Sequence, residues 1–186
     1  MATLENAETE ETLTCLCMTF YHPNQEEKQV FRDLNFSQCQ RVRADDVIKF
    51  GRDSNVCHFN LKDGRVSRIQ FALQFFRLFN SSEFGFEIKN LSKRVNLTVN
   101  NVELSYLNKV DLPENGIVSF GDYEILMEKR GGQSEDYFEI RFELASASLL
   151  LDRDLSFHQP IPESDISSPT EMDENEWEKS HKGQAG

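Results

Sequence analysis

The stretch Val47-Ile48-Lys49-Phe50-Gly51-Arg52 decides the fold, and Arg65-Val66-Ser67-Arg68 follows it a little further along the chain. The first four residues favour a β-strand. Gly51 ends it, because glycine adopts backbone angles that other residues resist or lets a ligand approach the main chain. Arg52 then projects a planar fork of donors from a rigid strand end, and Ser67 adds a hydroxyl between two further arginines. A guanidinium, a hydroxyl and additional cations are groups that bind phosphate. The same residues would also fit an ordinary strand and turn that expose an arginine.

Short strand-like runs continue at a regular spacing along the chain. Residues 12–21 are apolar on nearly both faces, which indicates a buried strand rather than a helix. Turn signals such as Asp63-Gly64 and Gly131-Gly132 separate the later runs. Many short strands without a convincing helix indicate an all-β sandwich or barrel. The further predicted strands are residues 29–36, 47–50, 57–61, 69–76, 84–88, 97–99, 117–120, 123–128 and 138–144.

The net charge of −12 on 186 residues is unevenly distributed. Residues 1–11 carry four acidic side chains and no basic ones, and residues 152–186 carry nine acidic and three basic ones. Residues 12–151 are nearly balanced, with 19 acidic and 17 basic side chains. We therefore expect a disordered acidic arm at residues 1–11, one folded domain at residues 12–150 and a disordered acidic tail at residues 151–186. This balance argues against nucleic acid as a partner.

Neither a signal-peptide pattern nor an apolar run of membrane-spanning length is visible, so the expected location is cytoplasmic, without a membrane partner. The cysteines Cys15, Cys17, Cys39 and Cys57 are then expected to be reduced thiols. Cys15 and Cys17 would share one face of a strand and could mimic half of a metal site. The four histidines show no ligand spacing around them, so we expect neither a metal nor a cofactor.

Catalytic motifs are missing from the sequence. It contains no Gly-x-Ser-x-Gly elbow, no P-loop, no His-Glu-x-x-His and no glycine-rich dinucleotide loop. Ser67 has no nearby histidine that would activate it as a nucleophile. The chain is therefore interpreted as a binding protein and not as an enzyme.

A series of short motifs, taken in order, resembles the signature of forkhead-associated (FHA) domains. They are Phe50-Gly51-Arg52, Val66-Ser67-Arg68-Ile69-Gln70, Asn90-Leu91-Ser92, Asn96-Leu97-Thr98-Val99-Asn100-Asn101, Leu104 and Phe120-Gly121-Asp122. The resemblance covers about residues 12–144. It implies a β-sandwich of about 11 strands whose loops at one end bind phosphothreonine peptides.

The FHA resemblance also implies roles for individual residues. Arg52 would fork onto the phosphate oxygens and Ser67 would hydrogen-bond one of them, with Gly51 allowing the tight turn. Lys89 would add charge, and Asn90 would bracket the main chain of the peptide.

Two departures from the FHA signature bear on this site. Gln70 occupies the position of a supporting histidine, and because glutamine donates and accepts hydrogen bonds we expect a retained but altered support. Asn96-Leu97 replaces an Asn-Gly pair and is preceded by extra residues. The asparagine that holds the ligand is therefore Asn90 or Asn96, with the intact Asn-Leu-Ser favouring Asn90. Arg65 and Arg68 are either charges at the rim of the site or a solvated face.

Two segments outside the predicted domain suggest partners. Thr9, within Glu8-Thr9-Glu10-Glu11-Thr12, is either part of a solvated acidic leader or a phosphoacceptor for an upstream protein kinase. In the tail, Pro169, Glu171 and Glu174 resemble the short peptide bound by TRAF-domain ubiquitin ligases. An FHA-type domain flanked by both segments resembles a family of innate-immune signalling adaptors that bind these ligases and activate NF-κB.

This second resemblance implies a mechanism. Phosphorylated Thr9 of one copy would dock at Arg52 and Ser67 of another, and such a head-to-tail contact need not close, so chains of copies can grow. Each added copy would display one more ligase-binding peptide. The alternative is an FHA reader of phosphothreonine on an unrelated partner protein.

Overall fold

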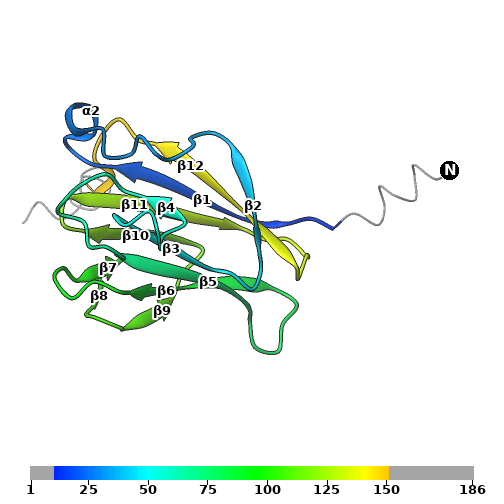
Figure 1. Ribbon diagram of the computed structural model, residues 1–186. Coiled ribbons are helices and arrows are strands. Elements are labelled where there is room, and N and C mark those ends of the chain that lie inside the picture. The colour runs from blue at the N-terminus through cyan, green and yellow to red at the C-terminus, as the bar shows by residue number, and fades with distance from the viewer. Residues whose placement is uncertain (1–10, 151–186) are drawn as a thin grey trace, which may run out of the picture. The chain divides into compact units, whose positions relative to one another are not determined.

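The computed structural model describes residues 11–150, in which twelve strands form two packed sheets (Figure 1). One sheet has the strand order β2-β12-β1-β11-β10-β7-β8 and the other the order β4-β3-β5-β6-β9. The predicted all-β sandwich is confirmed. The elements are β1 Thr14–Tyr21, α2 Gln25–Lys28, β2 Cys39–Arg43, β3 Val47–Gly51, β4 Phe59–Asn60, β5 Phe71–Arg77, β6 Phe84–Asn90, β7 Leu97–Val99, β8 Val102–Leu104, β9 Lys109–Asp111, β10 Asn115–Phe120, β11 Tyr123–Arg130 and β12 Tyr137–Leu144.

Strand β1 lies near the centre of the larger sheet, antiparallel to β11 and parallel to β12. Leu16, Met18 and Phe20 point into the core and are at most 1% exposed. Cys15 and Cys17, on the other side of the strand, are only half-buried. The side chains on one face of β1 are therefore buried and those on the other are half-buried, although the sequence is apolar on nearly both faces.

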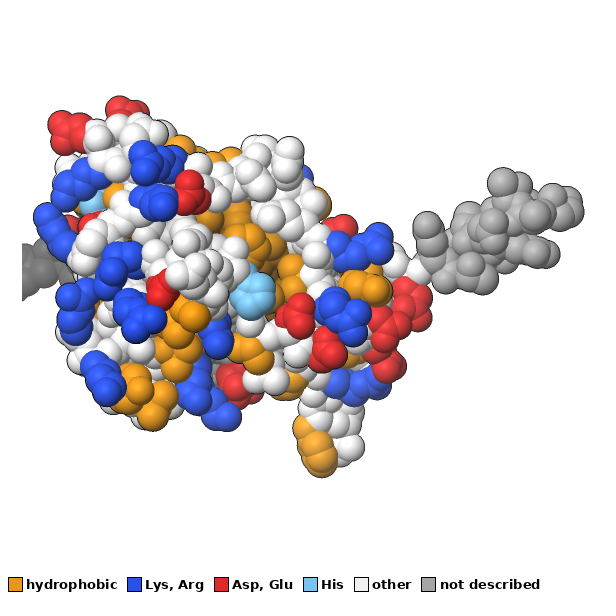
Figure 2. All heavy atoms as spheres, viewed as in Figure 1, with side chains coloured by type: hydrophobic (Ala, Val, Ile, Leu, Met, Phe, Trp, Pro, Cys, Tyr) orange, Lys and Arg blue, Asp and Glu red, His pale blue; other side chains and the backbone are white. Residues whose placement is uncertain are grey.

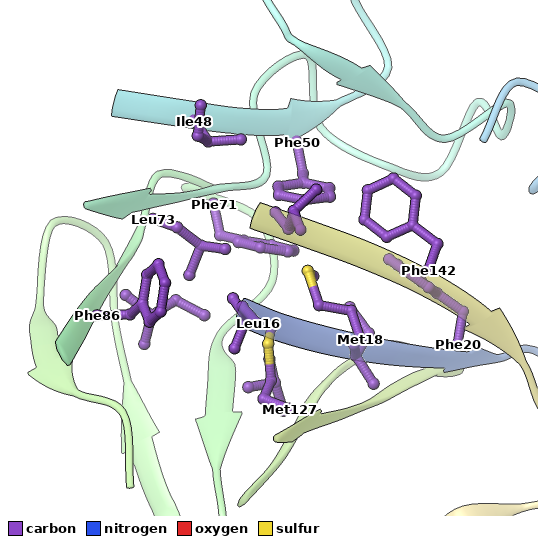
Figure 3. Packing of buried hydrophobic residues seen from close by; sticks show 14 of the residues in the cluster. Leu16, Met18, Phe20, Ile48, Phe50, Phe71, Leu73, Phe86, Met127 and Phe142 are labelled. Carbon is purple, nitrogen blue, oxygen red and sulfur yellow. The ribbon is translucent and has the colours of Figure 1, made fainter. Parts of the chain in front are cut away.

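Phenylalanine side chains fill the space between the sheets (Figure 3). The ring of Phe50 stacks on that of Phe71, with centroids 4.7 Å apart and planes 15° apart. The edge of Phe142, from the opposite sheet, meets Phe50 at 6.1 Å. Because Phe50 directly precedes Gly51 and Phe71 directly follows Gln70, this aromatic packing fixes the points from which two loops leave the smaller sheet.

The predicted strand at residues 29–36 is wrong. The short helix α2 ends at Lys28, its C-cap residue Gln29 has a left-handed backbone with φ 51° and ψ 44°, and turns follow it. Val30, Phe31 and Leu34 are nevertheless buried. Their spacing is that of one helical turn and not of alternating strand positions, so this segment contributes apolar side chains to the core and pairs with a strand only through an isolated bridge from Phe36 to Phe142 among residues 11–150.

Several sequence-based expectations concern residues that the structure does not describe. The phosphoacceptor Thr9, the motif residues Pro169, Glu171 and Glu174, and nearly all of the acidic arm and tail lie outside residues 11–150. Within these residues no helix is long and apolar enough to span a membrane. Over the same range, no group of three or more His, Cys, Asp or Glu side chains is arranged to hold a metal ion.

Candidate functional site

Loops at one end of the sandwich surround a shallow groove of about 600 Å³. They are the loop after β3, the loop before β5 and the loop after β6, together with Tyr106. Figure 2 shows Lys and Arg side chains gathered at the left of the view, where β6 ends in Figure 1. The groove is lined by four cations and by no carboxylate, and this composition favours an anionic ligand. Its lining residues are Arg52, Val56, Ser67, Arg68, Ile69, Leu91, Lys93, Arg94 and Tyr106.

Gly51 lets the first two loops pack against each other. A Cβ atom at this position would lie 2.3 Å from the carbonyl oxygen of Arg68 and 2.8 Å from Cα of Ile69. Just beyond it, the main-chain N–H of Arg52 donates to the carbonyl of Ser67 at 3.0 Å. The glycine is therefore required by the neighbouring main chain and not by a left-handed backbone.

Arg52 and Ser67, the two predicted phosphate ligands, lie in the same groove. The guanidinium of Arg52 is exposed, and its Nε donates to the carbonyl of Val66 at 2.9 Å. Within residues 11–150 no hydrogen bond occupies its two terminal NH₂ groups. Ser67 Oγ lies 2.7 Å from Oγ of the buried Ser92. A fixed guanidinium with open donors beside a hydroxyl can bind phosphate oxygens.

Of the two cations predicted at the rim of the site, Arg68 lines the groove and Arg65 does not. Arg68 lines the groove and donates to Asp53 from Nε at 3.1 Å and from NH2 at 2.8 Å. Hydrogen bonding from the Arg68 side chain, together with the main-chain N–H of Asn55, holds the pKa of Asp53 below its ordinary value. Arg65 does not line the groove, and its carbonyl accepts a hydrogen bond from the guanidinium of Arg94 at 2.9 Å.

Asn90 is buried, with 0% of its surface exposed, and does not line the groove. Its Nδ2 donates to the carbonyl of Leu104 at 2.9 Å, and its Oδ1 accepts from the N–H of Ser92 at 3.0 Å. The side chain thereby fastens the loop after β6 to strand β8, because a buried amide at a strand end needs partners for both of its polar atoms. That Asn90 also brackets the main chain of a ligand stays a prediction.

Lys89 and Asn96 are also not among the residues that line the groove. Lys89 is on β6, in register with Ala72 of β5 and Lys109 of β9. Asn96 is exposed and donates to Glu103 at 2.8 Å. Of the five central residues that the FHA resemblance implied, Arg52 and Ser67 line the groove, Gly51 shapes it, and Lys89 and Asn90 stand outside its lining.

The buried side chain of Gln70 supports the main chain of Ser67. It is 1% exposed, and its Oε1 accepts the main-chain N–H of Ser67 at 2.9 Å. Its own N–H donates to the carbonyl of Phe50 at 2.7 Å, and its carbonyl accepts from Leu91 at 3.0 Å. Glutamine thus joins all three loops of the groove, while its Nε2 finds no hydrogen-bond partner within the described residues.

Two cations that line the groove were not predicted from the sequence. Lys93 and Arg94 follow β6, with Nζ of Lys93 5.2 Å from the ring centroid of Tyr106. Both lie within the extra residues that precede Asn96. These extra residues could have indicated that Lys93 and Arg94 line the site, because an insertion next to a binding loop changes the residues that surround the ligand.

The chain is similar to several known proteins. The FHA domain family model matches residues 48–121. TRAF-interacting protein with FHA domain-containing protein A from Homo sapiens is 50% identical over 95% of this chain and 100% of that protein. The protein of the same name from Xenopus tropicalis is 49% identical over 92% of this chain and 97% of its own. The solved FHA domain of CT664 from Chlamydia trachomatis is only distantly similar, with a TM-score of 0.42 and 15% identity over 64% of this chain and 97% of that one. The identity over nearly the full length shows that the chain belongs to the family of TRAF-interacting protein with FHA domain-containing protein A.

Proposed function

We propose that the chain is a signalling adaptor, and not an enzyme, whose FHA domain binds phosphothreonine. The observation that carries this proposal is the groove in which Arg52 and Ser67 meet among cations and without a carboxylate. A phosphorylated threonine brings about −1.5 to −2 charges and three acceptor oxygens, which these groups complement. Charge-assisted hydrogen bonds of this kind contribute about 1.5–3 kcal/mol each.

The proposed ligand is phosphorylated Thr9 of another copy of the chain. Thr12 borders the same hollow as Phe84, at the start of β6, whereas Leu91, just beyond the end of β6, lines the groove. The seven residues of β6 separate these points by roughly 20 Å. Three residues of chain, from Thr12 to Thr9, span at most about 11 Å. Because this span is only about half the distance along β6, docking in the groove of another copy is favoured over docking in its own, which supports recognition between copies.

Docking between copies would drive assembly, because a head-to-tail contact need not close. An upstream kinase would phosphorylate Thr9, and growing assemblies would cluster the tail peptide with Pro169, Glu171 and Glu174. The relatives are named for interaction with TRAF proteins. By analogy the clustered peptides would engage a TRAF-family ubiquitin ligase in the cytoplasm and activate NF-κB in innate immunity, with avidity about 10²–10⁴ above that of one peptide.

Mixing two variants tests recognition between copies. Thr9→Ala removes the ligand and keeps the groove, whereas Arg52→Ala carrying phosphothreonine at position 9, installed by semisynthesis, keeps the ligand and removes the groove. Light scattering should find each variant alone at the mass of the unphosphorylated protein, and the mixture at a higher mass. Arg43→Ala carrying the same phosphothreonine is the matched control and should assemble alone, because Arg43 is an exposed cation that does not line the groove.

The alternative function is an FHA reader of phosphothreonine on an unrelated protein, with Thr9 uninvolved. In that case the mixture would stay at the resting mass, although the groove would still bind a phosphothreonine peptide from its true partner. Assembly by phosphorylated Arg52→Ala alone would contradict the proposed site itself.

A further inference from the structure

The groove holds more positive charge than one phosphate needs. Arg52 stands beside Ser67, and Arg68 is already paired with Asp53. Lys93 and Arg94 remain, and neither forms an ion pair with a carboxylate within residues 11–150. Two unpaired cations at the edge of a phosphate site leave room for further negative groups of the ligand.

Both cations are held in position before any ligand binds. The ammonium of Lys93 lies over the ring of Tyr106, a cation–π contact that restricts a flexible side chain. The main-chain N–H of Arg94 donates to Ser92 Oγ at 3.2 Å, and its guanidinium donates to the carbonyl of Arg65 at 2.9 Å. Because these contacts already restrict the two side chains, less conformational entropy is lost when they bind.

The acidic arm of another copy supplies the matching charges. Glu8 and Glu10 stand on either side of Thr9, and Glu11 follows. We infer that Lys93 and Arg94 bind carboxylates that flank the phosphorylated threonine, so that the groove selects phosphothreonine in an acidic segment over phosphothreonine alone. This inference rests on the proposed function and specifies its ligand.

Two peptides and three proteins test the inference. The first peptide spans residues 3–14 with phosphothreonine at position 9, and the second is identical except that Glu8, Glu10 and Glu11 are replaced by Gln. The proteins are the full chain with Thr9→Ala, so that its own arm does not compete, the same chain with Lys93→Gln and Arg94→Gln, and the same chain with Arg43→Gln as a matched loss of one exposed cation. Titration calorimetry gives six dissociation constants.

The unaltered groove should bind the acidic peptide about tenfold more tightly than the Gln peptide, since exposed ion pairs each add a small factor. The Lys93→Gln/Arg94→Gln protein should reduce this ratio to below about twofold while binding the Gln peptide as before. Arg43→Gln should keep the full ratio. Raising the salt concentration should shrink the ratio in the unaltered groove, because exposed charges are screened.

Equal affinities of the unaltered groove for both phosphopeptides would overturn the inference and leave the proposed function standing. A tenfold ratio that survives in the Lys93→Gln/Arg94→Gln protein would also overturn it, because other groups would then read the flanks. If the unaltered groove bound neither phosphopeptide, the proposed function itself would fail. The comparison between the two peptides requires no folded variant, so it remains decisive if the double substitution destabilises the chain.

Discussion

The hydroxyls of Ser92 and Ser67 lie 2.7 Å apart and share a hydrogen bond in which Ser92 is assigned as the donor. The direction follows from the other contacts of Ser92, whose Oγ already accepts the main-chain N–H groups of Arg94 at 3.2 Å and Val95 at 3.1 Å. A hydroxyl has two acceptor lone pairs and one donor, so only the donor remains for Ser67. Ser67 therefore keeps its own O–H for a ligand in the groove.

Ser92→Ala should weaken phosphopeptide binding although Ser92 lies outside the lining of the groove. The substitution removes the group that orients Ser67 and leaves two part-buried main-chain N–H groups without their acceptor, a loss of about 1 kcal/mol in stability. Calorimetry with the Thr9 phosphopeptide and urea unfolding measure the two effects. The exposed Ser105, whose hydroxyl bonds Asn108 at 2.7 Å, is the matched control as Ser105→Ala. Unchanged affinity in Ser92→Ala would remove its role in orienting Ser67.

Gly51→Ala should disrupt the groove from within the fold. The added methyl group would sit 2.3 Å from the carbonyl oxygen of Arg68, so the main chain must shift, at a cost of about 1–3 kcal/mol. The shift moves the loops of Arg52 and Ser67, and phosphopeptide affinity should fall together with the melting temperature. Gly64→Ala is the matched control in the same region, because a Cβ there meets nothing within 4 Å. If both substitutions had equal effects on affinity and melting temperature, the close approach of the main chain at position 51 would not explain why a glycine stands there.

The positions of Arg52 and Ser67 could be predicted because each follows or precedes a strand with a strong apolar pattern. The buried position of Asn90 could not. Whether a polar side chain at a strand end faces solvent or the interior depends on what folds over it, here Leu104 of the short strand β8. That contact joins residues 14 positions apart through a loop whose path the sequence does not specify.

The sequence also predicted only some of the strands in the two sheets. The central strands were found from their alternation of apolar residues, whereas β2, β8 and β9 were missed. All three lie at sheet edges. An edge strand has only one neighbour and is more exposed, so its residues need not show an apolar period. In β2, for example, Cys39–Arg43 has no buried residue at all.

Asn90→Ala and Arg52→Ala should separate support of the site from contact with the ligand. Asn90→Ala leaves the carbonyl of Leu104 and the N–H of Ser92 unpaired inside the protein, so the free energy of unfolding should fall by about 2–4 kcal/mol. Arg52→Ala removes an exposed side chain and should change stability by less than about 1 kcal/mol while reducing phosphopeptide affinity at least about tenfold. Urea unfolding and calorimetry on both variants measure this. A fully stable Asn90→Ala protein would contradict its structural role.

His22 should make the protein less stable as the pH falls below neutrality. Burial lowers the pKa of His22 from its ordinary value of 6.5, against the opposing effect of the nearby Asp63. Its Nδ1 accepts the N–H of Asn24 at 3.0 Å, and its ring packs 4.5 Å from that of Tyr123, which favours the neutral imidazole in the folded state. The unfolded chain therefore takes up a proton first. The stabilisation is complete above about pH 6.5 and is lost as the pH falls from there through the lowered pKa.

Urea unfolding at pH 7.5 and pH 5.5 measures this dependence. His22→Gln should lower stability at both values but flatten the difference between them, since the substituted side chain does not titrate. His58→Gln is the matched control at an exposed histidine and should keep the full difference. If His22→Gln retained the same decline, the decline would have to come from other groups. Asp63, whose pKa is lowered by its hydrogen bonds against the effect of burial, is not among them, because a carboxyl with a depressed pKa titrates well below pH 5.5.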